Sequence, residues 1–289
     1  MINIFQIISL LGVFIGSITD IKSLEVPDWL NYSLIALGLG GHLLWSLYDW
    51  NYLFIMKSLI GFGLSVAIGL LMFYTGQWGG GDSKMIFGLG ALLGLSWPLQ
   101  WEFYSNFLVN VLFFGAFYGL IWVVAKGFMY RKKVSKLFKK YLKSKKYARI
   151  RVISGVISII GLVIIYVIPN LDYSFRIVMT GLLVFLYFMN YVFIIVRAIE
   201  KVSMIKMIEP EKLTEGDWIV KDIKIDGKKI VGPKDLGIEK DQIKILIDAK
   251  KKGIIDKVMV KYGIPFVPSF LFALIYTLIY NRIVLFSFL

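Results

Sequence analysis

Long apolar runs constrain this chain more strongly than any other feature of its sequence. One helical crossing of a bilayer needs about 20 mostly apolar residues, and eight stretches of the chain have this character. Apolar residues make up 58% of the sequence, which excludes an ordinary soluble domain. The runs are also continuous, whereas the strands of a membrane barrel alternate with period two. We therefore predict an all-α polytopic membrane protein with about eight transmembrane helices. The runs lie at residues 3–19, 29–48, 52–75, 85–101, 105–125, 152–169, 177–196 and 263–280.

A charged segment, residues 199–262, separates the last apolar run from the others. Within it, residues 218–225 and 229–231 favour short strands around the turn signal Asp226-Gly227. The apolar residues of 238–252 follow helical spacing, and Gly253 marks the end of that helix. We therefore predict a small α+β insert. The predicted divisions are 1–198, a transmembrane core with a basic loop at 126–151; 199–262, the soluble insert; and 263–289, the final transmembrane helix.

The distribution of positive charge predicts how the chain is oriented. The segment Lys126–Arg151 contains twelve Lys or Arg and no Asp or Glu. Cytoplasmic loops of membrane proteins are enriched in Lys and Arg, so this segment should lie in the cytoplasm. The first run lacks the flanks of a cleaved signal, so we expect a retained helix. Counting crossings then places Asp20, Asp82 and the insert together on the cytoplasmic side of a plasma membrane. Because orientation explains the net charge of +14, we expect no nucleic-acid partner, although the basic segment also suits membrane lipid with anionic headgroups.

The sequence lacks the residues of several common catalytic sites. It contains no cysteine, which excludes disulfides, thiolate catalysis and Cys-x-x-Cys zinc sites. Its single histidine, His42, lies inside an apolar run and has no second histidine with which to share a metal. A helix-packing or hydrogen-bonding role is therefore expected for His42. We expect no metal and no other cofactor.

A glycine-rich segment, residues 78–84 (Trp-Gly-Gly-Gly-Asp-Ser-Lys), joins the third and fourth runs and carries an acidic residue, Asp82. An ionisable side chain at a membrane boundary is costly and usually functional. Asp20, at the end of the first run, is predicted on the same side of the membrane. Two carboxylates about 3 Å apart share a proton, so one can activate water while the other polarises a carbonyl group. We predict that this pair is catalytic, and that Gly79 and Gly81 lie in a bend that an extended substrate can approach closely.

Each aspartate also fits a simpler role. Asp82 precedes the fourth run, where a carboxylate commonly caps a helix. Asp20 lies next to Lys22 and equally fits a solvated residue at the membrane boundary. A cation-coupled transporter, with both aspartates as ligands beside a broken helix, is a further alternative. The chain has no second glycine-rich segment of this kind, which disfavours a transporter built from inverted repeats.

Two motifs, in their order along the chain, resemble those of the GxGD-type aspartic peptidases of the prepilin peptidase family. Residues 79–82 match Gly-x-Gly-Asp, and residues 83–91 resemble the family's continuation through a lysine, here Lys84, into a helix of small residues. Residues 19–22 (Thr-Asp-Ile-Lys) and 26–30 (Val-Pro-Asp-Trp-Leu) resemble the family pattern Asp-x-(Lys/Arg), then (Ile/Val)-Pro-(Asn/Asp). The resemblance covers residues 1–125 well and the later part more loosely.

The chain departs from the bacterial members of that family. Those members commonly carry an amino-terminal Cys-x-x-Cys domain and also methylate the new amino terminus, whereas this chain has no cysteine. It therefore resembles the archaeal, peptidase-only branch. Presenilin-like proteases share Gly-x-Gly-Asp but place the partner aspartate in a Tyr-Asp pair. The one such pair here, Tyr48-Asp49, is predicted on the opposite side of the membrane, so that branch is rejected.

The resemblance implies a membrane-embedded aspartic endopeptidase. It would remove the short basic leader of type IV prepilin or preflagellin (archaellin) precursors at the cytoplasmic face. Asp20 and Asp82 would form the catalytic pair. Lys22 and Lys84 would tune this pair or contact substrate, although an interfacial position is the favoured interpretation for both. A non-catalytic pilus assembly factor that kept the fold is the alternative. The residues that would bind substrate or shape the site are Gly79, Gly81, Lys84, Lys22 and Pro27.

Overall fold

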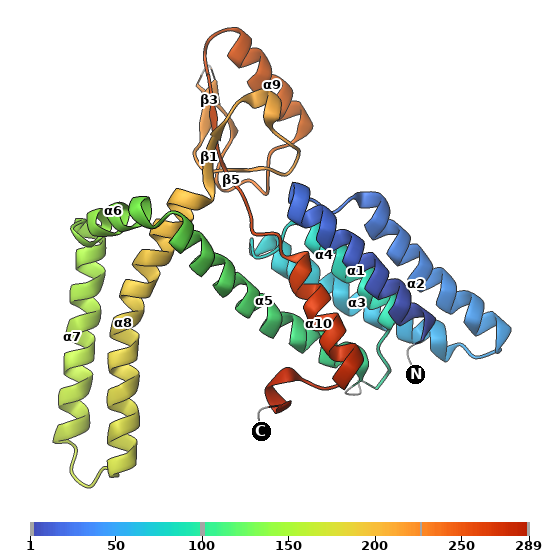
Figure 1. The fold of residues 1–289 in the computed structure, drawn as a ribbon, viewed down its shortest axis with the longest axis horizontal. Coiled ribbons are helices and arrows are strands. Elements are labelled where there is room, and N and C mark those ends of the chain that lie inside the picture. Colours follow the sequence, from blue (N-terminus) through green and yellow to red (C-terminus); the bar gives the residue numbers. More distant parts are fainter. Residues whose placement is uncertain (1–2, 99–101, 226, 288–289) are drawn as a thin grey trace. The chain divides into compact units, whose positions relative to one another are not determined.

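The computed structural model describes residues 3–98, 102–225 and 227–287 and is mainly helical (Figure 1). Each predicted apolar run contains a helix, so the prediction of a polytopic helical membrane protein is confirmed. In the run predicted at 85–101, however, the helix ends at Leu93 and residues 94–98 are not helical. The end of the run predicted at 85–101 and Asp226 of the predicted turn lie outside the described residues. The helices of the runs are α1 (Ile4–Ser23), α2 (Asp28–Tyr48), α3 (Leu53–Tyr74), α4 (Gly80–Leu93), α5 (Phe103–Met129), α7 (Lys145–Val167), α8 (Tyr173–Ser203) and α10 (Val267–Tyr280).

The helices differ in their ability to cross a bilayer. Among the described residues, five helices are long and apolar enough to do so, namely α1, α3, α5, α7 and α8. Helix α4 has 14 residues, which corresponds to about 21 Å and is shorter than a hydrocarbon core of about 30 Å. Most side chains of α4 are nevertheless buried. It is therefore an interior helix, enclosed by longer neighbours.

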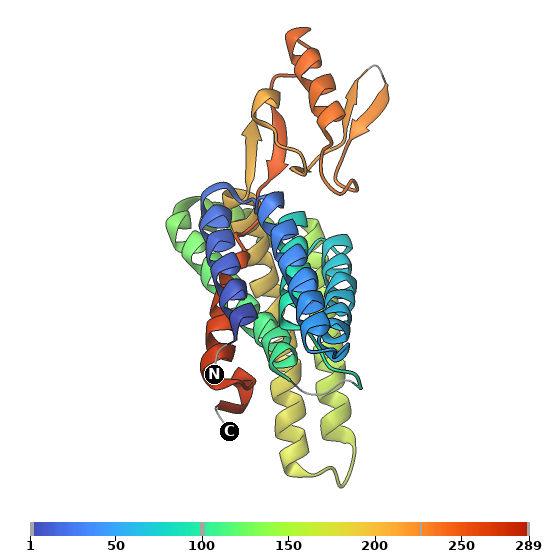
Figure 2. The same cartoon turned by 90° about the vertical axis from the view of Figure 1, so that its right-hand side faces the viewer.

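Small residues allow the neighbours of α4 to approach it closely. Helix α4 packs against α1, α2 and α3, and α10 lies alongside α1 (Figures 1 and 2). A Cβ atom on Gly38 would come within 2.6 Å of the Ala91 carbonyl carbon. Ser58 Oγ donates to the Ala91 carbonyl oxygen at 2.6 Å, which joins α3 to α4. Such small-residue contacts are typical of membrane helix packing.

The segment 126–151 is mostly helical, which corrects the prediction of a basic loop there. Helix α5 continues to Met129, α6 spans Arg131–Leu142, and α7 begins at Lys145. The apolar residues of α6 recur at helical spacing and pack against the end of α8, so burial of one face stabilises the helix despite its charge. The residues that pack together include Val134, Leu137, Phe138 and Tyr141 of α6 and Ala198 and Ile199 of α8.

The predicted α+β insert is present. Its strands form a three-stranded sheet in the order β1-β5-β2 and a separate antiparallel hairpin of β3 and β4. The single strand predicted at 218–225 is divided between these sheets. Residue Ile219 pairs with Val260 of β5, and Ile223 pairs with Val231 of β4. The strands are β1 (Ile205–Ile208), β2 (Trp218–Ile219), β3 (Ile223–Ile225), β4 (Lys228–Val231) and β5 (Val258–Lys261). The helices are the 3₁₀ helix η1 (Pro210–Lys212) and α9 (Lys240–Lys251). A second 3₁₀ helix, η2 (Val284–Ser287), follows α10.

The chain divides into two compact units. One unit comprises Met1–Ile121 with Met207–Leu289, and the other comprises Trp122–Lys206. The predicted divisions at 198/199 and 262/263 follow changes in composition, whereas the compact units divide the chain at other positions. The first unit contains both aspartates of the predicted catalytic pair. In the second, α7 and α8 lie side by side and α6 packs against α8 (Figure 1).

Candidate active site

Asp20 lies in the last full turn of α1 and is only 4% exposed. Its Oδ2 atom accepts the backbone N–H of Val267 at 2.9 Å, and the backbone N–H of Phe266 also donates to this carboxyl group. Both donors stand at the start of α10, where the N–H groups of a helix have no partner within the helix. The positive end of the α10 dipole therefore points at Asp20.

Asp82 lies in the first turn of α4 and is half-buried. Its Oδ2 atom accepts the backbone N–H of Gly79 at 2.9 Å. The capping role considered from the sequence is thus present, but it is accompanied by an electrostatic interaction between Asp82 and Asp20. The structure therefore brings the two predicted aspartates together. Neighbouring carboxyl groups of this kind tend to share a proton, which suits acid–base chemistry.

The glycine-rich segment corrects the predicted bend. The turn between α3 and α4 lies earlier, at residues 75–78, where Gly76 has a positive φ of 70°. Gly79 precedes α4 directly, and both Gly80 and Gly81 belong to α4. A Cβ atom on Gly81 would stand 3.2 Å from the backbone N and the Cβ of Val26. The missing side chain at Gly81 therefore makes room for the α1–α2 connection. Gly79 is less crowded, since a Cβ there would meet only the Asp82 carboxylate at 3.4 Å.

Residues at the start of α2, and Val26 just before it, contact Gly81 and fix its position. Pro27 precedes α2 with φ of −59° and places Val26 against Gly81. Farther along α2, the side-chain amide of Asn31 donates to the Gly81 carbonyl oxygen at 3.4 Å. Asn31 is completely buried, and its side-chain oxygen has no hydrogen-bond partner in the described structure. The residue before Asp82 is thus fixed by the segment that follows Asp20.

The two predicted lysines have different surroundings. Lys84 forms an ion pair with Asp28 of α2 at 2.6 Å, and its ammonium group lies 5.5 Å from the centre of the Tyr32 ring. Lys84 therefore connects α4 to α2. Lys22 is exposed in the last turn of α1, where a positive charge also suits the helix dipole.

Sequence reasoning missed an aromatic cluster beside the aspartates. Trp78 lies 5.9 Å from Phe266 and 5.2 Å from Phe270 between ring centres, and these two phenylalanines are 5.6 Å apart. Tyr118 of α5 was also missed, although it interacts electrostatically with Asp20. The proline-flanked stretch 264–268 marked only the start of a helix. The spacing of residues in this stretch does not indicate that Val267 contacts Asp20, which lies 247 positions earlier.

His42 has the packing role expected from the sequence. Its Nδ1 atom lies 2.8 Å from the Gly38 carbonyl oxygen, and its ring stacks on Phe5 with centres 3.8 Å apart. Within the described ranges, no three His, Asp or Glu side chains lie together in the way that a metal cluster would need.

Comparison with known proteins relates the aspartate-bearing part of the chain to one family. Residues 7–124 match the model of the type IV leader peptidase family. Over these residues, the chain is similar to the type IV leader peptidase family. The match includes Asp20 and Asp82 but stops before Val267, so the α10 contact with Asp20 lies outside it.

Named leader peptidases are similar over a shorter stretch. The preflagellin peptidase of Methanocaldococcus jannaschii is 40% identical over 89 residues, which are 30% of this chain and 37% of that protein. That of Methanococcus voltae is 42% identical over 88 residues, 30% of this chain and 36% of that protein. That of Methanococcus maripaludis is 37% identical over 87 residues, 30% of this chain and 37% of that protein. The chain thus spans little more than a third of the length of these curated relatives. No solved structure matches it significantly.

Proposed function

We propose that this chain is a membrane-embedded aspartic endopeptidase that removes the short basic leader from type IV prepilin or preflagellin precursors. One observation carries the proposal. Asp20 and Asp82 lie far apart in the sequence, yet they interact at the end of α1 and the start of α4. Both also fall within the stretch matched by the type IV leader peptidase family.

The proposed reaction uses the two carboxyl groups in different roles. Asp20, in its ionised form, takes a proton from a water molecule as that water attacks the scissile carbonyl carbon. Asp82, in its protonated form, donates a hydrogen bond to the carbonyl oxygen. The assignment follows from the number of donors. Two N–H groups, those of Val267 and Phe266, stabilise negative charge on Asp20, whereas one, that of Gly79, donates to Asp82. Asp20 then gives the proton taken from water to the leaving nitrogen, and the C–N bond breaks as the carbonyl group re-forms. Asp20 is again ionised and Asp82 is still protonated, so the pair is ready for the next cycle.

The other predicted site residues support this reaction by shaping the site. Gly79 has no side chain, so an extended substrate backbone can approach Asp82 closely there. Pro27 sets the position of Val26 against Gly81, and Lys84 links α4 to α2. Exposed Lys22 is available to contact substrate or lipid headgroups. The substrate's hydrophobic segment would lie against the apolar outer surface of the bundle.

The site is proposed to face the cytoplasm at the plasma membrane. The support is the run of twelve Lys or Arg at 126–151, because such segments remain on the cytoplasmic side. Helix α5 connects this segment to the unit that contains the aspartates.

The proposed function is tested with the full chain, purified in detergent and mixed with leader-bearing type IV pilin or archaellin precursors. Mass spectrometry of the products should show a single cut that releases the basic leader before the hydrophobic segment. A metal chelator should leave the rate unchanged, because the proposed chemistry needs only carboxyl groups and water. Failure to cut any precursor would contradict the function, and loss of cutting on chelation would favour the cation-binding alternative.

A further inference from the structure

Helix α6 separates apolar and basic side chains onto opposite faces. Its apolar face is covered, because Val134 is 4% exposed against Ala198 and Ile199 of α8. The opposite face carries lysines, most of them three or four positions apart, and Lys143 directly follows the helix. We call these residues the lysine face. Its members are all exposed: Lys132, Lys136, Lys139, Lys140 and Lys143.

The lysine face lacks a counter-charge within its own unit. The sequence between Trp122 and Lys206 holds two carboxylates, Asp172 and Glu200. Asp172 caps α8 by accepting the Phe175 N–H at 3.1 Å, and Glu200 pairs with Arg197 at 3.0 Å. In the part of this unit that the structure describes, no ion pair involves a residue of the lysine face. Lysines at this spacing repel one another, so binding of negatively charged groups from another molecule would stabilise the face.

The insert shows that the same chain can neutralise its lysines internally. There, Lys250 pairs with Glu211 at 2.8 Å, and Lys229 pairs with Asp235 at 3.2 Å. Orientation in the membrane accounts for a high number of positive charges at 126–151. It does not require that they be gathered on one face of a helix whose other face is already packed.

The connections of α6 fix its surroundings. It is joined at one end to α5 and at the other, after two residues, to α7, and both neighbours are long and apolar enough to cross a membrane. A helix between two such spans must stay near the surface of the bilayer, where lipid headgroups lie. Cationic amphipathic helices at this depth attract anionic lipids.

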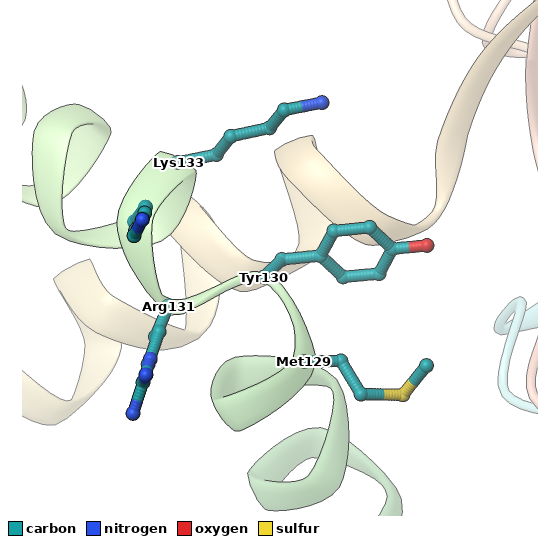
Figure 3. A pocket seen from close by; sticks show the side chains of 5 residues that line it. Met129, Tyr130, Arg131 and Lys133 are labelled. Atoms are coloured by element: carbon teal, nitrogen blue, oxygen red, sulfur yellow. The ribbon is translucent and has the colours of Figure 1, made fainter.

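We propose that the lysine face of α6 binds the headgroups of anionic lipids. The corner where α5 meets α6 extends the cationic surface. An open hollow of about 250 Å³ there is lined by Met129, Tyr130, Arg131, Lys132 and Lys133. In Figure 3, Lys133, Tyr130 and Met129 point to one side, whereas Arg131 points away from them. The side chains do not converge on one point, which suits a layer of headgroups better than a single enclosed ligand.

The test uses the full chain in an uncharged detergent and measures bound lipid by native mass spectrometry. Phosphatidylglycerol serves as the anionic probe and phosphatidylcholine as the neutral one. The test variant carries Lys132→Gln, Lys136→Gln, Lys139→Gln and Lys143→Gln. The matched control removes four exposed lysines of the insert and carries Lys228→Gln, Lys234→Gln, Lys252→Gln and Lys257→Gln.

The native chain and the insert control should bind phosphatidylglycerol at least about tenfold more tightly than phosphatidylcholine, and the α6 variant should lose this preference. Salt at about 0.5 M should weaken the preference by screening. Without anionic lipid, the α6 variant should unfold at a temperature no lower than that of the native chain, because it loses only repulsion between lysines. This result excludes loss of folding as the cause. Equal binding by the native chain and the α6 variant, or an equal loss in the insert control, would overturn the proposal. So would selective binding of polyglutamate without a preference for phosphatidylglycerol, since that would assign the face to an acidic protein.

Discussion

At the scale of single residues, Gly81 links the two halves of the candidate site. It directly precedes Asp82, and it lies against Val26, which follows Asp20 by six positions. A Cβ atom at Gly81 would stand 3.2 Å from Val26, so Val26 must shift slightly to admit a side chain there. Gly80 occupies the same helical turn but is open, since the nearest atom to a Cβ there is a carbon of Phe73 at 3.9 Å. The two glycines therefore form a matched pair for mutation.

We expect Gly81→Ala to lower both the stability and the cleavage rate, and Gly80→Ala to preserve both. The added methyl group at Gly81 must displace Val26, and such overpacking costs about 1 kcal/mol or more. At Gly80, alanine meets no obstacle and favours the helix. Thermal unfolding and leader cleavage of both variants check this prediction. Equal behaviour of the two variants would show that the Val26 contact is unimportant.

Substitution of Lys84 can show whether this residue binds substrate or only joins α4 to α2. Its ion pair with Asp28 is partly exposed, with 34% and 61% of the two side chains accessible, so solvent weakens it. We expect Lys84→Met and Asp28→Asn each to cost less than about 1 kcal/mol of stability. The double variant should cost less than the sum of the two, because the interaction is lost only once.

The same variants should leave KM for the precursor unchanged if Lys84 only ties α4 to α2. A rise in KM for Lys84→Met that Asp28→Asn does not reproduce would instead assign Lys84 to substrate binding.

At the scale of elements, the helices and the aspartate motifs could be predicted, but the assembled site could not. The apolar runs predicted α1 to α5 because helix formation in a membrane follows local composition. The interaction between Asp20 and Asp82 was inferred from two motifs and a count of crossings. The contact of Asp20 with Val267 depends on the docking of α10 beside α1, which no local pattern encodes. The sequence did not predict α6, because the many charged residues of this segment favoured a solvated loop. Four apolar residues at helical spacing nevertheless pack and stabilise the helix.

Asp217 provides a pH-dependent property of the insert, outside the membrane helices. Burial raises the pKa of its carboxyl group above the ordinary value of 3.8, and the negative charge of Glu25 adds to the rise. The N–H of Thr214, which donates to Asp217 at 2.8 Å, opposes it. Because the folded state holds this proton more tightly than the unfolded state, its contribution to stability is full below pH 3.8 and is lost as pH rises through the folded pKa.

We therefore expect the stability of the native chain, relative to that of Asp217→Asn, to fall as pH rises from about 3.5 upward. Asparagine keeps an acceptor for the Thr214 N–H but has no proton to lose. Unfolding of the insert, followed by hydrogen exchange of its amides across this pH range, checks the prediction. Identical pH dependence in the native chain and the variant would contradict it.

At the scale of the whole molecule, the proposed chemistry and the proposed lipid surface belong to different compact units. Asp20, Asp82 and the start of α10 lie in one unit, and α6 lies in the other. The family match covers most of the first four helices and α5, whereas the insert, α6 and α10 lie outside it. Changes in α6 should therefore alter lipid binding without abolishing the carboxyl chemistry.

The most direct test of the account compares leader removal by the native chain, Asp20→Asn, Asp82→Asn and a control, Asp49→Asn, under identical conditions. Asp49 stands at the far end of α2, where it accepts the Trp45 indole N–H, and takes no part in the proposed site. Each site variant should fold normally and cut the precursor at least about a hundredfold more slowly, since each loses one partner of the acid–base pair. The control should cut at the native rate. Native-like cleavage by either Asp20→Asn or Asp82→Asn would contradict the central claim.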